Sequence, residues 1–227
     1  MLLLLLMSTG QASISIDGEA ITGFPRVLGL MLTLMNALIC LLAIGLSCAT
    51  IANEYKRGSA HLVWVRNISQ PTYHIGLTLG NCLASVLASG LLHLVLAIFL
   101  ILQGQADLLP RVLPAFGLSL ISLLASATLT SVLGLFLPPL AGAITALLLI
   151  GAGLAHQTLE TLSFFSDGSS SRLLRLILSL APNLSGVTRQ IHQLMLGREL
   201  DPFPLIQVLF WTYLISWVLL LYRKKAA

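Results

Sequence analysis

The amino-acid sequence predicts an all-α fold, a bundle of helices that crosses a membrane several times. Charged residues make up 9% of the 227 residues and hydrophobic residues 57%, whereas a soluble domain carries roughly 25% charged residues. So few charges cannot cover a water-soluble surface, and the expected solvent is a lipid bilayer. In hydrocarbon a helix satisfies its own backbone hydrogen bonds and an open sheet does not. We therefore expect residues 1–227 to form a single transmembrane helical domain.

Five apolar segments are long enough to cross a hydrocarbon core of ~30 Å at about 1.5 Å per residue. The predicted spans cover residues 27–52, 73–102, 112–137, 140–162 and 204–222.

Residues 1–25 precede the first complete span. Met1–Met7 is apolar but too short to cross a bilayer, and Ser8–Phe24 is polar and rich in turn-forming residues. We interpret this region as the end of a truncated first helix followed by an outer loop.

The connections between the spans differ in kind. Residues 53–72 form a charged segment, and residues 103–111 form a short outer loop. Pro138 and Pro139 predict a tight turn, because proline ends one helix and is favoured at the start of the next. Residues 160–203 are long enough to form an outer loop with helices of its own.

Two short helices are expected in that outer loop. Arg172 and Arg175 lie among leucines, a pattern typical of an amphipathic helix at a membrane interface. Pro182 and Asn183 break this helix, and a second one is expected over residues 184–196. We predict that both lie at the outer interface.

Basic residues indicate the orientation. Lys56, Arg57 and Arg66 lie between the first two complete spans, and the basic residues of 223–225 end the last span. With five alternating spans both groups fall on one side, which the positive-inside rule assigns to the cytoplasm.

The sequence favours a function without catalysis. It contains no dinucleotide-binding glycine motif, no P-loop, no zinc-binding HExxH motif and no nucleophile elbow. His93 and His156 lie in or near spans with no second ionisable group at matching depth, so a hydrogen-bonded packing role is favoured for each. We expect no enzymatic activity and no metal site, and we treat the free cysteines as small apolar residues. These are Cys40, Cys48 and Cys82.

The charged segment 53–72 is the most informative part of the chain. Residues 60–66 predict a short helix with Trp64 on its apolar body, and Ser69 and Pro71 predict the start of the next helix. The segment is then either a docking element for a partner in the cytoplasm or an ordinary basic loop anchored by Trp64. Gly76 and Gly80 form a small-residue face that favours close helix packing.

The residues around this segment resemble the type-2 ABC transporter permeases, most closely those grouped with multi-copper enzyme maturation. Residues 54–80 read EYKRGSAHLVWVRNISQPTYHIGLTLG, and Leu77 stands where the family usually has lysine. Further on, SLAPNLSGV resembles the segment before the family's last helix, and LLLYRKK resembles its basic end. The positions that match around the segment are Glu54, Gly58, Arg66, Pro71, Gly76 and Gly80.

The resemblance implies a permease of six helices in the bacterial inner membrane. It would pair with a second permease copy, identical or different, and with a cytoplasmic dimer of ABC ATPase subunits that bind ATP and magnesium. The chain itself would hold no cofactor and bind no nucleic acid, and the complex would export its substrate.

The resemblance also implies roles for particular residues. Residues 54–69 would be a coupling helix, with Glu54 and Arg57 in polar contacts with the ATPase and Trp64 as an apolar anchor. Gly58 and Arg66 belong to the same motif. The outer gate would involve Arg172, Arg175, Pro182 and Asn183. Two alternatives stay open: an intramembrane hydrolase or lipid transferase that uses a histidine, and a non-transporting membrane assembly subunit.

Overall fold

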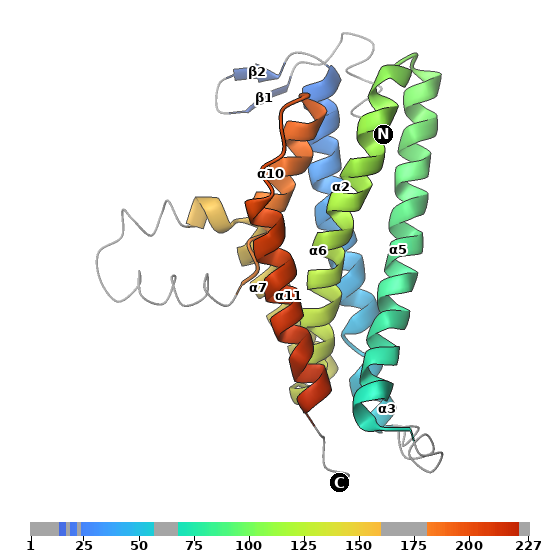
Figure 1. Ribbon diagram of the computed structural model, residues 1–227, viewed down its shortest axis with the longest axis vertical. Helices are drawn as coiled ribbons and strands as arrows, with labels where there is room; N and C mark the ends of the chain where they lie inside the picture. Colours follow the sequence, from blue (N-terminus) through green and yellow to red (C-terminus); the bar gives the residue numbers. More distant parts are fainter. Residues whose placement is uncertain (1–13, 17–18, 22–23, 57–67, 160–180, 223–227) are drawn as a thin grey trace, which may run out of the picture.

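The computed structural model describes residues 14–16, 19–21, 24–56, 68–159 and 181–222. These residues form a bundle whose long helices lie side by side, with a small hairpin near one end (Figure 1). In chain order the helices are α2 (Phe24–Ser47), α3 (Thr50–Lys56), α5 (Gln70–Leu102), the 3-10 turn η1 (Ala106–Leu108), α6 (Leu109–Phe136), α7 (Pro139–Leu154), α10 (Leu184–Met195) and α11 (Phe203–Leu221).

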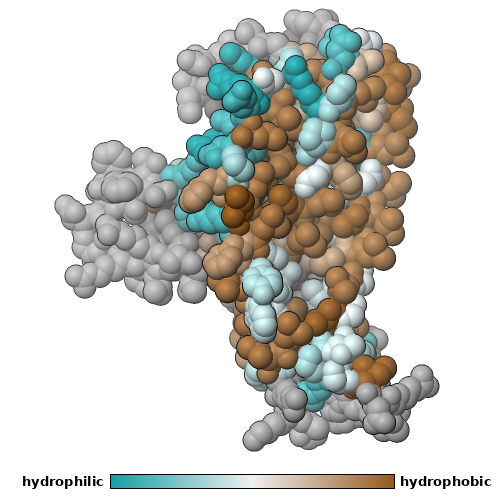
Figure 2. Space-filling model, viewed as in Figure 1, coloured by the Kyte–Doolittle hydropathy of each residue, from teal (hydrophilic) through white to brown (hydrophobic). Residues whose placement is uncertain are grey.

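Four described helical stretches are long and apolar enough to cross a membrane. They are Phe24–Tyr55, Gln70–Leu102, Ala106–Phe136 and Phe203–Leu221. Much of the face in Figure 2 is apolar, and hydrophilic residues gather near the end that carries α10 and the hairpin. The helical character predicted from composition is thereby confirmed, and four of the described helices are long and apolar enough for the predicted membrane spans.

The predicted fifth span, residues 140–162, corresponds to a shorter helix. α7 has 16 residues, which gives it a length of about 24 Å, less than the ~30 Å hydrocarbon core. The helix ends at Leu154, and residues 160–162 lie outside the described part of the chain. The count of five spans therefore stays a prediction, as does the truncated first helix, since residues 1–13 are also outside that part.

Local sequence signals set the predicted helix boundaries. Ser69 caps α5, where its hydroxyl accepts a hydrogen bond from the backbone N–H of Thr72 at 3.4 Å, and Pro71 occupies the first turn. Pro138 precedes α7, which begins at Pro139, so the tight turn after α6 is confirmed. Both starts follow from the preference for a hydroxyl at the cap and for proline in the first turn.

α6 is the central helix and packs against all the other helices of the bundle that the structure describes. Its buried face carries small hydroxyl residues, and two of them donate back to the helix's own carbonyl groups: Ser126 to Ser122 at 2.8 Å and Thr130 to Ser126 at 2.7 Å. Because these bonds satisfy the hydroxyls locally, small polar residues can lie in the core and let neighbouring helices approach closely.

The second outer helix packs against the bundle. α10 matches the predicted segment 184–196 to within a residue and lies against α2 and α6, while its position at the outer interface stays a prediction. Leu184, Val187, Ile191 and Met195 are buried there. The first outer helix, over residues 172–180, is outside the described residues.

A two-stranded hairpin is the one departure from an all-helical fold in the described chain. β1 (Ile14–Ile16) pairs antiparallel with β2 (Glu19–Ile21), with Ile14 opposite Ile21. The sequence analysis predicted a polar, turn-rich outer loop here and no strands, although Asp-Gly, the pair at positions 17 and 18, is typical of a tight hairpin turn.

Candidate functional site

Three side-chain pairs join α3 to the beginning of α5. The Tyr73 hydroxyl donates to the Glu54 carboxylate at 2.6 Å, and the Tyr55 hydroxyl lies 2.7 Å from Nε2 of His74. Deeper in the bundle, the amide of Asn81 donates to the Thr50 hydroxyl at 3.0 Å. We call these three pairs the α3–α5 clasp.

The clasp fixes rotation as well as distance. Glu54 and Tyr55 are successive residues and therefore project from α3 about 100° apart, since the helix has about 3.6 residues per turn. Their partners, Tyr73 and His74, are also successive residues on α5. Two bonds in different directions resist both sliding and turning of one helix against the other. The acceptor of the Tyr73 hydrogen bond is the carboxylate of Glu54, and hydrogen bonds to a charged acceptor are shorter and stronger than bonds between neutral groups.

An apolar cluster packs next to the clasp. Ile51 of α3 packs with Val132 and Leu135 of α6 and with Leu219 of α11. Tyr55 and Tyr222 contact the same cluster, so the end of α3 and the end of α11 meet at one end of the bundle. Figure 1 shows this arrangement, with α3 and the C-terminus at the same end. Residues 57–67 and 223–225 lie outside the described part of the chain, so the prediction that the two basic groups share one side stays a prediction.

The structure places one residue of the predicted docking set. Glu54 lies in the clasp, where it bonds Tyr73 within the chain. The other four predicted residues lie outside the described part of the chain: Arg57, Gly58, Trp64 and Arg66. Their contact with a partner stays a prediction.

Gly76 and Gly80 lie on an exposed face of α5. A Cβ atom built on either glycine would meet no atom within 4 Å. Ala84 continues this small-residue face one turn further, and it is also exposed. Within the described residues the face is therefore not used for packing inside the chain.

Two of the four predicted gate residues are described. Pro182 is buried, and its backbone carbonyl faces Gly153 near the end of α7. Asn183 caps α10 by accepting a hydrogen bond from the N–H of Gly186 at 3.2 Å. This junction of α7, α10 and α11 lies where α7 ends, part of the way along the bundle (Figure 1). Arg172 and Arg175 lie outside the described residues.

Two polar residues that the sequence analysis overlooked hold α10 in place. The amide of Asn36, fully buried in α2, donates to the hydroxyls of Ser122 and Thr188, each at 3.3 Å. At the other end of α10, Arg111 donates to the carbonyl of Met195 at 2.6 Å. A cation at this position satisfies a carbonyl that has no partner within its helix and interacts favourably with the helix dipole.

His192 also lies on α10, close to α2. A Cβ on Gly29 would lie 2.5 Å from Nδ1 of this histidine, so glycine is what allows the two helices to approach. Burial lowers the pKa of His192, and the nearby positive charges of Arg198 and Arg26 lower it further.

Within the described part of the chain, no bond joins His93 or His156 to a second ionisable group. His93 contacts the Ser89 carbonyl at 2.9 Å and the ring of Phe116. His156 follows α7 and is partly exposed. Among the residues that the structure describes, no group of three or more histidine, cysteine or acidic side chains could hold a metal ion.

Comparison of the chain with protein-family models, with curated proteins and with solved structures found no match.

Proposed function

We propose that this chain is the membrane permease subunit of an ATP-driven exporter, and that residues 54–69 dock on a separate ATPase subunit. The observation that carries the proposal is the α3–α5 clasp. It ties together the two helices that enter and leave the basic segment, at the end of the bundle that also holds the last residues of α11.

The clasp suits the transmission of force. Residues 57–67 connect α3 to α5, so a push on this segment acts on both helices. Because Glu54 and Tyr55 bond successive residues of α5, the two helices would move as one body instead of separating. Closure of an ATPase pair beneath the segment would then rock the bundle. The chain would hydrolyse no ATP itself.

A second permease copy would pack on the exposed small-residue face of α5. Gly76 and Gly80 leave space for a helix to approach closely, as small residues do at many helix contacts in membranes. The complex would then have two permeases and two ATPase subunits in a bacterial inner membrane.

Tyr73→Phe tests the force-transmission role. The substitution removes only the hydroxyl that bonds Glu54, which we expect to weaken the clasp by about 1–2 kcal/mol for a partly exposed bond to a charged group. In proteoliposomes that contain a cognate ABC ATPase, the variant should still bind the ATPase but stimulate ATP hydrolysis less than the wild type does.

Tyr213→Phe is the matched control. Tyr213 is exposed on α11, and the described structure shows only a ring contact with Trp217 for its side chain. The control should stimulate ATP hydrolysis like the wild type. Equal stimulation by Tyr73→Phe and by the wild type would contradict the role given to the clasp.

A further inference from the structure

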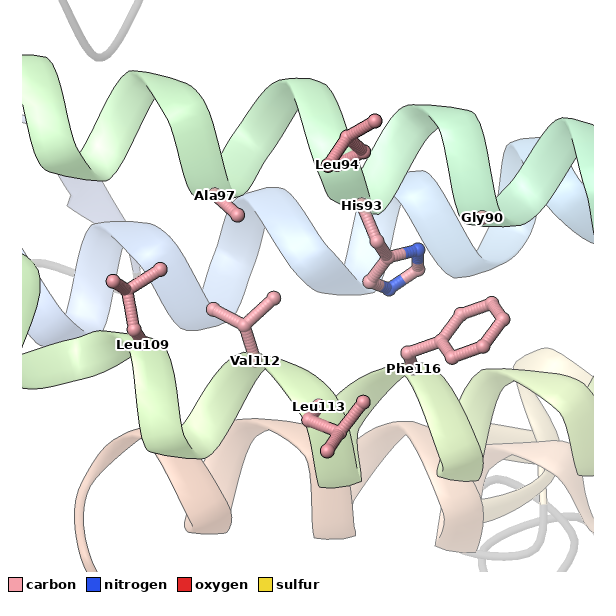
Figure 3. Close-up of a pocket in the computed structure, with 8 residues that line it drawn as sticks. All are labelled: Gly90, His93, Leu94, Ala97, Leu109, Val112, Leu113 and Phe116. Carbon is pink, nitrogen blue, oxygen red and sulfur yellow. The ribbon is translucent and has the colours of Figure 1, made fainter.

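A groove between α5 and α6 contains one polar group in an apolar surface. The groove has a volume of about 310 Å³, within the range of about 300–1,000 Å³ typical of small-molecule sites. Gly90, Leu94 and Ala97 of α5 form one side, and Leu113 and Phe116 of α6 form the other (Figure 3). Among the described residues that line it, only His93 has a polar side chain.

The backbone fixes the orientation of the His93 ring. Nδ1 lies 2.9 Å from the carbonyl oxygen of Ser89, one turn earlier in α5. Because a carbonyl can only accept, Nδ1 carries the hydrogen. In the uncharged ring, which an apolar environment favours, Nε2 is then a bare acceptor. Phe116 packs against the ring edge-to-face with centroids 5.1 Å apart and holds it in this position.

Nε2 faces the groove without a partner. Figure 3 shows the ring projecting from α5 toward α6, with one nitrogen turned away from its own helix. No described residue hydrogen-bonds this atom, although His93 is only 6% exposed. Polar groups buried in hydrocarbon normally find a partner or mark a functional site.

Water and phospholipid headgroups fit this position poorly. An ordered water needs two to four polar partners, and the groove offers only the one imidazole. His93 lies nine residues before the end of α5 at Leu102, which places it about 14 Å inside that end. A bulky charged headgroup would find no charged partner among the residues described as lining the groove, whereas a single hydroxyl on an apolar molecule would match both the acceptor and the walls.

We propose that the α5–α6 groove binds a lipid-soluble molecule that carries a hydroxyl group, and that this hydroxyl donates a hydrogen bond to Nε2 of His93. The apolar body of the molecule lies against the walls formed by Leu94, Ala97 and Leu113. This site is independent of the transport function proposed above.

The test uses the full chain in lipid nanodiscs with histidine labelled by heavy nitrogen. The probe is para-hexylphenol, and the matched control is hexylbenzene, which lacks the hydroxyl. Nitrogen NMR should show the Nε2 signal of His93, identified through its contact with the Phe116 ring, moving in the direction of hydrogen-bond acceptance with the phenol alone. The chain has five histidines, and the signals of the other four should not move.

His93→Phe supplies the second measurement. It keeps an aromatic ring but removes the acceptor, so the affinity for para-hexylphenol should fall about three- to tenfold, the effect of one neutral hydrogen bond. The affinity for hexylbenzene should not change. Equal shifts with both probes would mean that the groove holds only apolar chains, and the absence of a shift at saturating phenol would overturn the proposal. The NMR comparison uses the unmodified chain, so it decides the question even if the variant does not fold.

Discussion

Gly153→Ala probes the contact that joins α7 to α10. A methyl group at this buried position would overlap the backbone carbonyl oxygen of Pro182. That carbonyl cannot easily move aside, because it accepts a hydrogen bond from the N–H of Leu184 at 2.8 Å. The new methyl would also lie 3.5 Å from the Leu184 side chain. The two segments must therefore separate.

The expected magnitude follows from two opposing effects. Overpacking costs about 1–3 kcal/mol, and a rigid backbone oxygen places this site near the upper value. Alanine gains about 1 kcal/mol over glycine inside a helix. We expect Gly153→Ala to lower the free energy of unfolding by about 2 kcal/mol.

Gly151→Ala is the control, two residues earlier in the same helix. Gly151 is exposed, and a Cβ there would meet no atom within 4 Å. It should gain up to about 1 kcal/mol, so the two variants should differ by about 3 kcal/mol. Thermal unfolding of the full chain in mild detergent, followed by tryptophan fluorescence, should separate them by about 6–12 °C. Equal stability of the two variants would refute the contact between α7 and Pro182.

Substitutions at two positions, Asn36 and Arg111, test the residues that hold α10. Asn36→Asp should destabilise the chain by about 2.5–3.5 kcal/mol, because it buries a charge within a predicted span. Asn36→Leu should cost less than about 1 kcal/mol. It removes two long hydrogen bonds, but it also removes a buried oxygen that has no partner among the described residues. Detergent-induced unfolding measures the stability of both variants. Equal losses of stability in Asn36→Asp and Asn36→Leu would contradict the buried, apolar surroundings of Asn36. Arg111→Met should lower the free energy of unfolding by about 1–2 kcal/mol and speed amide exchange in the last turn of α10. Arg189 is exposed, so Arg189→Met should change neither quantity. Unchanged amide exchange in Arg111→Met would contradict the capping role.

Local signals made much of the fold predictable. Ser69 and Pro71 mark the start of α5, and the prolines before α7 mark the turn, because a cap and a fixed backbone angle act within a few residues. Composition alone predicted apolar helices long enough to cross a bilayer, and four such helices are present among the described residues. The length of α7 was not predictable, because residues 140–162 are apolar throughout most of their length and carry no stop signal at Leu154.

The clasp could be predicted in part from the sequence. In two helices joined by a short segment, residues near the joined ends can face each other. Glu54 lies two residues before the end of α3, and Tyr73 lies three residues after the start of α5. The packing of α10 against α2 and α6 could not be predicted from the sequence. It depends on Asn36 and Arg111, which are distant in sequence, and the polar pattern of α10 is equally typical of a helix at a membrane interface.

The most direct test of the proposed function measures the docking of an ATPase on residues 54–69. The full chain is purified from membranes together with a cognate ABC ATPase, and ATP hydrolysis is measured for the wild type, for Trp64→Ala and for Trp217→Ala, in which the substituted tryptophan is exposed on α11. We predict that the wild type and Trp217→Ala bind the ATPase and stimulate it, and that Trp64→Ala does neither while remaining in the membrane. Undiminished association and stimulation with Trp64→Ala, or a wild-type chain that binds and stimulates no ABC ATPase, would contradict the account.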